Sequence, residues 1–159
     1  MLKSVEFMSL KSMKSLQPNK AVAVISIHDS STLRDLPTFN GFLDVLRLNM
    51  LDVCEEHMRQ APGAWAEEPS VEQHSEYCSI DENYAPSLSH ANAIRAFVDI
   101  IHAHADAIEL VVHCSAGVSR SAAVAGWTSE RFGVKLHDRA GVGLKEANPR
   151  ITRLLRSLD

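Results

Sequence analysis

The sequence has few cysteines and no long hydrophobic run. Only three of its 159 residues are cysteine, an odd and low number that argues against a disulfide framework and favours a reducing compartment. Charged residues appear early at the amino terminus, and the apolar runs there are too short for a signal peptide. Elsewhere in the sequence, no apolar run approaches the length of a membrane-spanning helix. We therefore expect a cytoplasmic protein that does not enter a membrane.

The sequence also lacks an excess of positive charge. Lysine and arginine number 16 against 20 aspartate and glutamate residues, which gives a net charge of −4. A chain with this balance has no global field to hold nucleic acid or an anionic membrane, so we expect neither as a partner. The composition, 45% apolar and 23% charged, is that of globular proteins and excludes disordered, collagen-like and coiled-coil chains. Internal repeats and low-complexity tracts are absent, and the length fits one domain.

Short apolar runs alternate with longer amphipathic segments along the chain, a pattern typical of an α/β fold. We expect one domain over residues 1–159, with three layers, a central mostly parallel sheet of four to five strands, and helices on both faces. The expected strands are residues 4–10 at a sheet edge, 21–27, 45–50 and 108–112. The expected helices are a turn up to residue 16, a helix capped by Ser87 or Ser89 that runs to about 105, and helices at 119–132, 137–147 and 151–158.

Residues 54–85 form an irregular insert with no hydrophobic period. A segment of this length without secondary structure is uncommon inside a compact domain and is often functional. It contains Cys54-x2-His57 and His74-x3-Cys78, whose spacing is similar to that of a zinc site with two cysteines and two histidines. Chance placement in a polar loop explains these residues more simply in a chain with eight histidines. We expect no metal and no cofactor.

One segment, Val111-Val-His-Cys-Ser-Ala-Gly-Val-Ser-Arg-Ser121, stands apart from the rest. An apolar strand leads to Cys114, five residues follow, and Arg120 opens a helix. Five consecutive backbone N–H groups that turn into a helix amino terminus form a concave site for an anion. Gly117 permits a backbone angle that other residues resist. The planar guanidinium of Arg120 can bind two phosphate oxygens at once.

The same positive field acts on the Cys114 thiol. A helix amino terminus and a neighbouring arginine both favour the thiolate, which is the nucleophilic form of cysteine. A thiolate beneath a phosphate held by several donors is placed for covalent phosphoryl transfer. Phosphoryl transfer mainly requires positioning and charge stabilisation, and a loop of this composition supplies both.

The string His113-Cys114-x5-Arg120-Ser121 resembles the active-site loop of cysteine-dependent protein tyrosine phosphatases, and most of all that of the dual-specificity branch. Ala-Asn-Pro-Arg at 147–150 is similar to a turn between the last helices of small bacterial phosphatases of this type. Residues 25–27 and 46–52 also resemble segments of those proteins. The resemblance covers most of the chain except the insert, and it implies a tyrosine-phosphatase-like fold.

The resemblance implies a role for each residue of this string. Cys114 would be the nucleophile that forms a phosphocysteine, and Arg120 would clamp the phosphate. The Ser121 hydroxyl would help Cys114 to leave when water attacks, and His113 would hold the loop and tune the thiolate. The residues that would bind the phosphate are Ser115, Ala116, Gly117, Val118, Ser119 and Arg120.

The leaving group needs a proton, which an aspartate on a loop gives in this family. Asp81 lies at about the separation from Cys114 that the resemblance implies, whereas Asp52 lies much farther away in sequence. However, Asp52 follows a strand, and ligands of parallel sheets collect beyond the carboxyl ends of the strands. We therefore expect the ends at residues 28–29, Asp52 and Cys114 to share one rim. We choose Asp52 as the general acid and keep Asp81 as the alternative.

The substrate class follows from what the loop lacks. Its residues between Cys114 and Arg120 include no lysine, whereas phosphatases of highly phosphorylated inositides tend to carry extra cations there. We expect a phosphorylated protein or peptide, with phosphotyrosine first and phosphoserine or phosphothreonine as further substrates. Two alternatives remain. A phosphate-binding module without a working acid would bind phosphopeptide without turnover, and a sulfurtransferase would form a persulfide.

Overall fold

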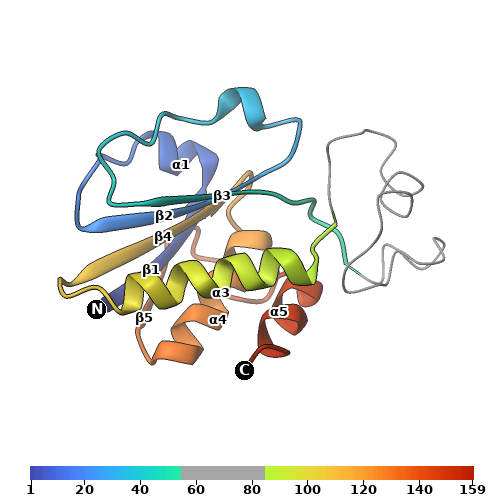
Figure 1. Ribbon diagram of the computed structural model, residues 1–159. Coiled ribbons are helices and arrows are strands. Elements are labelled where there is room, and N and C mark those ends of the chain that lie inside the picture. The colour runs from blue at the N-terminus through green and yellow to red at the C-terminus, as the bar shows by residue number, and fades with distance from the viewer. Residues whose placement is uncertain (55–84) are drawn as a thin grey trace.

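The computed structural model describes residues 1–54 and 85–159, and these form an α/β structure around one parallel sheet (Figure 1). The strand order is β3-β2-β4-β1-β5. The strands are β1 (Leu2–Ser9), β2 (Val22–His28), β3 (Val45–Asn49), β4 (Ile108–Cys114) and β5 (Lys135–Asp138). The helices are α1 (Leu10–Lys14), α3 (Leu88–His102), α4 (Arg120–Phe132) and α5 (Pro149–Arg156), with the short 3-10 helix η1 (Leu33–Asp35).

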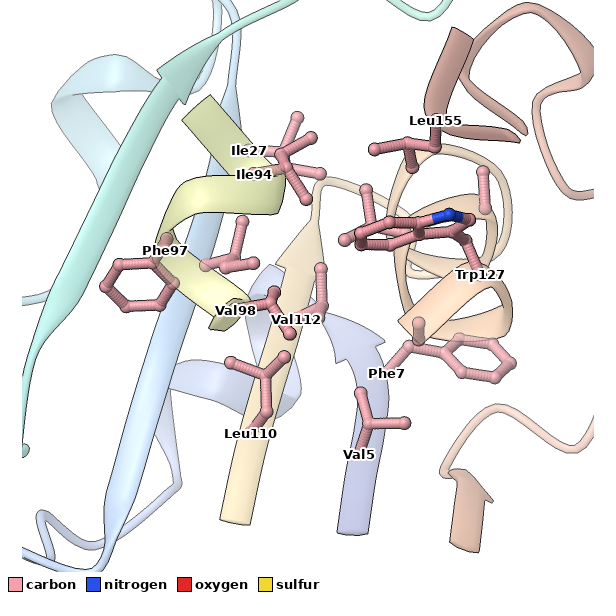
Figure 2. Packing of buried hydrophobic residues seen from close by; sticks show 14 of the residues in the cluster. Val5, Phe7, Ile27, Ile94, Phe97, Val98, Leu110, Val112, Trp127 and Leu155 are labelled. Atoms are coloured by element: carbon pink, nitrogen blue, oxygen red, sulfur yellow. The ribbon is translucent and has the colours of Figure 1, made fainter. Parts of the chain in front are cut away.

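The main hydrophobic core lies between the sheet and the layer of α3, α4 and α5. Strand side chains alternate between the two faces, so Val5 and Phe7 of β1 point into this core together with Leu110 and Val112 of β4. Figure 2 shows these side chains packed with Trp127 of α4 and with residues of α3 and α5. Helix α3 presents one apolar face to the core because its buried residues recur at helical spacing: Ala91, Ile94, Phe97, Val98 and Ile101.

A second, smaller core covers the opposite face of the sheet. Met8 of β1 and Val24 of β2 point to this side, where Met13 of α1 and the rings of Phe39 and Phe42 pack over them. Helical structure therefore flanks both faces. The expected three-layer α/β fold with a mostly parallel sheet of four to five strands is confirmed, and Ser87 is the residue that caps α3.

Two expectations about individual elements were wrong. The strand expected at residues 4–10 is not at the sheet edge, because β1 lies between β4 and β5. Ser4 and Glu6 place polar side chains among the apolar residues of that segment. Strands β4 and β5 pair with its two edges, and the layers on both faces of the sheet bury its side chains, so Val5, Phe7 and Met8 are each 0% exposed.

The second error concerns residues 137–147, where a helix was expected. The chain forms β5 beside β1 and then a series of turns. The carboxylate of Asp138 accepts hydrogen bonds from the backbone N–H groups of Ala140 and Gly141, at 2.8 and 2.9 Å. Gly141 and Gly143 adopt positive φ angles of 71° and 68°. An aspartate that competes for backbone donors and left-handed glycines both oppose a helix.

The parallel arrangement brings four strand ends to one edge of the sheet. Ser9 of β1 is in register with Cys114 of β4, and His28 of β2 is in register with Asn49 of β3. The expectation of a shared rim is therefore confirmed for the strands before Asp29, Asp52 and Cys114. None of the helices in the described part of the chain is long and apolar enough to cross a membrane.

Candidate active site

The loop of residues 114–120 connects β4 to α4, and Gly117 fixes its shape. Gly117 has a φ of +79°, and a Cβ atom built on it would lie 2.2 Å from the Ser9 nitrogen and 2.4 Å from the Met8 carbonyl carbon. Both clashes are with backbone, so only glycine fits at this place. The loop is also joined to the end of β1 because the Leu10 N–H donates to the Ser115 carbonyl at 3.2 Å.

The Cys114 thiol lies at the base of this loop and is 1% exposed. Its Sγ atom accepts a hydrogen bond from the Gly117 N–H at 3.3 Å. The Ser121 hydroxyl, on the first turn of α4, lies 3.2 Å from the same sulfur. The Gly117 N–H and the Ser121 hydroxyl therefore both lie within hydrogen-bonding distance of the one sulfur.

Arg120 closes the loop with a guanidinium that three different segments orient. Its Nη1 atom donates to Asp29 Oδ2 at 3.1 Å and to the Met50 carbonyl at 2.8 Å. Its Nη2 atom donates to Ser115 Oγ at 3.1 Å. Arg120 is 4% exposed, and its buried Nε–H has no hydrogen-bond partner within the described residues. A buried charged donor without an acceptor is costly, and at this place in the loop an anion close to the guanidinium would offset that cost.

Asp29 is a site residue to which the sequence analysis gave no role. Burial alone would raise the pKa of the Asp29 carboxyl, but hydrogen bonds from Ser31 and the Arg120 charge outweigh burial and hold it below its ordinary value. Asp29 therefore stays ionised at neutral pH as the counter-ion of Arg120. The signal that could have identified it was its position directly after the second strand, on the same rim as Cys114.

Asp52 lies beside the 114–120 loop, as the strand-end argument required. Its Oδ1 atom accepts a hydrogen bond from Ser119 Oγ at 2.6 Å and another from Asn148 Nδ2 at 2.9 Å. The structure thus brings Asp52 against a residue of the loop that holds Cys114 and Arg120. Asp81, the alternative acid, lies outside the described residues. Asn148 is the second residue that the sequence analysis did not identify as part of the site.

His113 directly precedes Cys114 and is 0% exposed. Its ring stacks on Phe39, with centroids 6.0 Å apart, and neither ring nitrogen has a hydrogen-bond partner among the residues described. Burial lowers the pKa of His113 to about 4, with further contributions from His28 and Arg120. Burial also lowers the pKa of His28. His113 is therefore a neutral packing residue at pH 7, and its ring adds no positive charge beside the thiol.

The remaining expected phosphate-binding residues line the open side of the loop. Ala116 is exposed, Val118 is half-buried, and Ser115 and Ser119 use their hydroxyls on Arg120 and Asp52. Of the residues with zinc-like spacing, only Cys54 is described, while His57, His74 and Cys78 lie outside the described residues. Within residues 1–54 and 85–159, no group of three or more His, Cys, Asp or Glu side chains could hold a metal ion.

The arrangement brings together side chains that could bind and cleave an ester of a tetrahedral oxyanion such as phosphate. The buried Cys114 sulfur accepts the Gly117 N–H, and the Arg120 guanidinium is held against the same loop by Ser115. A carboxylate lies beside the same loop, and a hydroxyl touches the sulfur. Such a site can hold a tetrahedral anion against a sulfur nucleophile while a carboxylic acid protonates the leaving group.

We compared the chain with protein-family models, with curated proteins and with solved structures. No family model, curated protein or solved structure matched it.

Proposed function

We propose that this protein hydrolyses phosphate monoesters through a phosphocysteine intermediate, as a protein tyrosine phosphatase or dual-specificity-like phosphatase does. The observation that carries the proposal is the environment of Cys114. Its buried sulfur accepts the Gly117 N–H and lies 3.2 Å from the Ser121 hydroxyl, inside a loop that Arg120 closes. A structural cysteine requires neither an oriented buried arginine nor hydrogen-bond donors around its sulfur.

In the first step, the Cys114 thiolate attacks phosphorus, so an S–P bond forms and the P–O bond to the leaving group breaks. Asp52 begins as the neutral acid and gives its proton to the departing oxygen. The alcohol or phenol therefore leaves uncharged, and Asp52 becomes a carboxylate. Arg120 and the backbone N–H groups of the loop bind the non-bridging oxygens, where negative charge is spread in the transition state.

In the second step, water hydrolyses the phosphocysteine. The Asp52 carboxylate takes a proton from the water molecule while the water oxygen attacks phosphorus. The S–P bond breaks, and its electron pair returns to sulfur. The Ser121 hydroxyl donates a hydrogen bond to the sulfur as its negative charge develops. Inorganic phosphate is released, and Asp52 regains the proton needed for the next cycle.

The chemistry of the loop favours a phosphorylated protein or peptide as substrate, with phosphotyrosine first. The residues between Cys114 and Arg120 carry no cationic side chain. Arg120, the only arginine of the loop, can bind the oxygens of one phosphate group. A substrate with several phosphates would need further cations near the loop. The net charge of −4 supports the same choice.

The test is hydrolysis of p-nitrophenyl phosphate and a phosphotyrosine peptide in buffer that contains a metal chelator. Cys114→Ser should abolish turnover, whereas the matched control Cys54→Ser, which removes another buried cysteine, should retain it. With the phosphotyrosine peptide, Asp52→Asn should lower kcat about 100-fold and remove the fall in rate at high pH, because the general acid is lost. Asp81→Asn should behave like the wild type.

Three other outcomes separate the alternatives. A large loss in Asp81→Asn but not in Asp52→Asn would move the acid to Asp81. Binding of the phosphotyrosine peptide without turnover by the wild type would support a phosphate-binding module. Turnover by Cys114→Ser at the wild-type rate would contradict the phosphocysteine mechanism.

A further inference from the structure

Asn148 lies where the general acid, the 114–120 loop and helix α5 meet, and it is 3% exposed. Its Nδ2 atom donates to Asp52 Oδ1 at 2.9 Å and to the Val53 carbonyl at 3.1 Å. Its Oδ1 atom accepts the Ile151 N–H at 3.1 Å and so caps α5. Its backbone N–H donates to the Ser119 carbonyl at 3.2 Å. One buried side chain and its backbone thus join three separate segments.

We propose that Asn148 is a positioning residue for the general acid: its amide holds Asp52 against the 114–120 loop in the orientation that protonates the leaving group. The inference rests on the proposed function, since it assigns a role in that reaction. It concerns a residue that touches neither the phosphate nor the sulfur. Asn148 acts only through Asp52 and Val53, so it is not itself a catalytic residue.

The capping of α5 uses the side-chain oxygen of Asn148 and does not explain why an NH2 group is present at this position. Serine and aspartate cap helices about as well as asparagine because capping needs only a side-chain acceptor. Asparagine differs from both by carrying an NH2 group with two donors. In this structure that group is directed to Asp52 and to the neighbouring Val53 carbonyl, while the oxygen caps α5. The acceptor thus serves the helix, and the donors serve the segment that carries the acid.

The hydrogen bonds to Asp52 also select which oxygen carries its proton. Ser119 and Asn148 both donate to Oδ1, which must therefore act as the acceptor oxygen of the carboxyl group. The acidic proton is left on Oδ2, which has no hydrogen-bond partner within the part of the chain that the structure describes. The bond between the Asn148 N–H and the Ser119 carbonyl ties the two donors together. The acid is thus fixed relative to the loop that binds the phosphate.

The sharpest variant is Asn148→Ser, which keeps a capping oxygen for α5 but cannot reach Asp52. The readout is kcat/KM for phenyl phosphate relative to kcat/KM for p-nitrophenyl phosphate. Phenol resembles the tyrosine side chain, whose pKa is about 10, so phenolate leaves poorly without a proton. The p-nitrophenolate ion is a far better leaving group, and its departure depends much less on the acid.

We expect Asn148→Ser to lower kcat/KM for phenyl phosphate roughly tenfold, the effect of losing one hydrogen bond to an ionisable group. The value for p-nitrophenyl phosphate should change little, and the melting temperature should stay close to that of the wild type. Asn148→Ala is the structural control, because it also removes the cap of α5 and should lower the melting temperature. Asn148→Gln keeps the amide on a longer side chain. Its ratio of kcat/KM for phenyl phosphate to kcat/KM for p-nitrophenyl phosphate should lie between those of Asn148→Ser and the wild type.

Two results would overturn the inference. An equal fall for both substrates in Asn148→Ser would show a general structural effect, and no fall for either would show that the amide does not position the acid. Failure of the proposed function is recognised separately, because wild-type protein would then not hydrolyse p-nitrophenyl phosphate, or Cys114→Ser would hydrolyse it equally well. The substrate ratio of Asn148→Ser is therefore interpreted only once wild-type protein hydrolyses p-nitrophenyl phosphate and Cys114→Ser does not.

Discussion

The Nη1 atom of Arg120 lies 3.1 Å from Oδ2 of Asp29, in an ion pair whose side chains are only 5% and 15% exposed. Asp29 follows β2, and Arg120 begins α4, so the pair crosses the rim where the parallel strands end. Arg120 also donates to the Met50 carbonyl. The guanidinium is therefore oriented before any substrate binds, and preorganised donors are the main source of electrostatic catalysis.

We predict that Asp29→Asn weakens the folded protein and that phosphate offsets part of the loss. Removal of the carboxylate leaves the buried Arg120 without a full counter-charge, and a buried donor whose partner is weakened costs on the order of 1–3 kcal/mol. A bound phosphate supplies negative charge to the same guanidinium. Melting temperatures with and without inorganic phosphate should show a larger phosphate-dependent increase for the variant than for the wild type. Equal increases would contradict the assignment of Arg120 as the phosphate ligand.

Gly117→Ala should both destabilise the fold and abolish activity. A Cβ atom at this φ of +79° would lie 2.2 Å from the Ser9 nitrogen, so the loop must move away from β1. We expect a loss of at least about 2 kcal/mol in unfolding free energy, together with loss of turnover. Gly133→Ala is the matched control, because Gly133 has a φ of +62° but nothing within 4 Å of an added Cβ. Chemical denaturation should therefore show a smaller loss for Gly133→Ala, with activity retained.

The buried His113 should make stability depend on pH. Its pKa is about 4 in the folded protein, because of burial first and then of His28 and Arg120, against an ordinary value of 6.5. Between these values the unfolded chain binds more protons than the folded chain, so stability falls as the pH falls. The full effect is about 3 kcal/mol and is complete only near the lower pKa.

The measurement is urea denaturation at several pH values from about 7 to about 5. His113→Phe should flatten the dependence of unfolding free energy on pH, because phenylalanine cannot titrate and can still stack on Phe39. His137→Gln is the control, since it removes an exposed histidine on β5. An unchanged slope in His113→Phe, or equal flattening in both variants, would contradict this explanation.

Ser121→Ala should slow the breakdown of the intermediate more than its formation. The Ser121 hydroxyl lies 3.2 Å from the Cys114 sulfur and can stabilise the thiolate as it leaves. Loss of one hydrogen bond to a charged group should slow this step on the order of tenfold or more. Rapid-mixing kinetics with p-nitrophenyl phosphate should then show a burst of p-nitrophenol. A burst of the same size in wild type and variant would argue against this role.

The residues of the 114–120 loop could be predicted because they are adjacent in sequence and their chemistry is local. The position of Asp52 beside this loop could be predicted because parallel strands end at a common edge of the sheet. The partnership of Asp29 with Arg120 could not, since it depends on how two distant segments pack. The contact of Asn148 with Asp52 joins residues 96 positions apart, and no periodicity in the sequence encodes it. A helix was expected where β5 ends, because the hydrogen bonds of Asp138 to its neighbours and the positive φ angles of the glycines that follow, which prevent a helix there, are not visible in the hydrophobic pattern.

The most direct test of the account is to locate the covalent intermediate. Wild-type protein and Ser121→Ala are mixed with a phosphotyrosine peptide, quenched within milliseconds, digested and examined by mass spectrometry. We expect one added phosphoryl group on the peptide that contains Cys114, with a larger amount in Ser121→Ala. Turnover without a phosphoryl group on Cys114, or with the group on another residue, would contradict it.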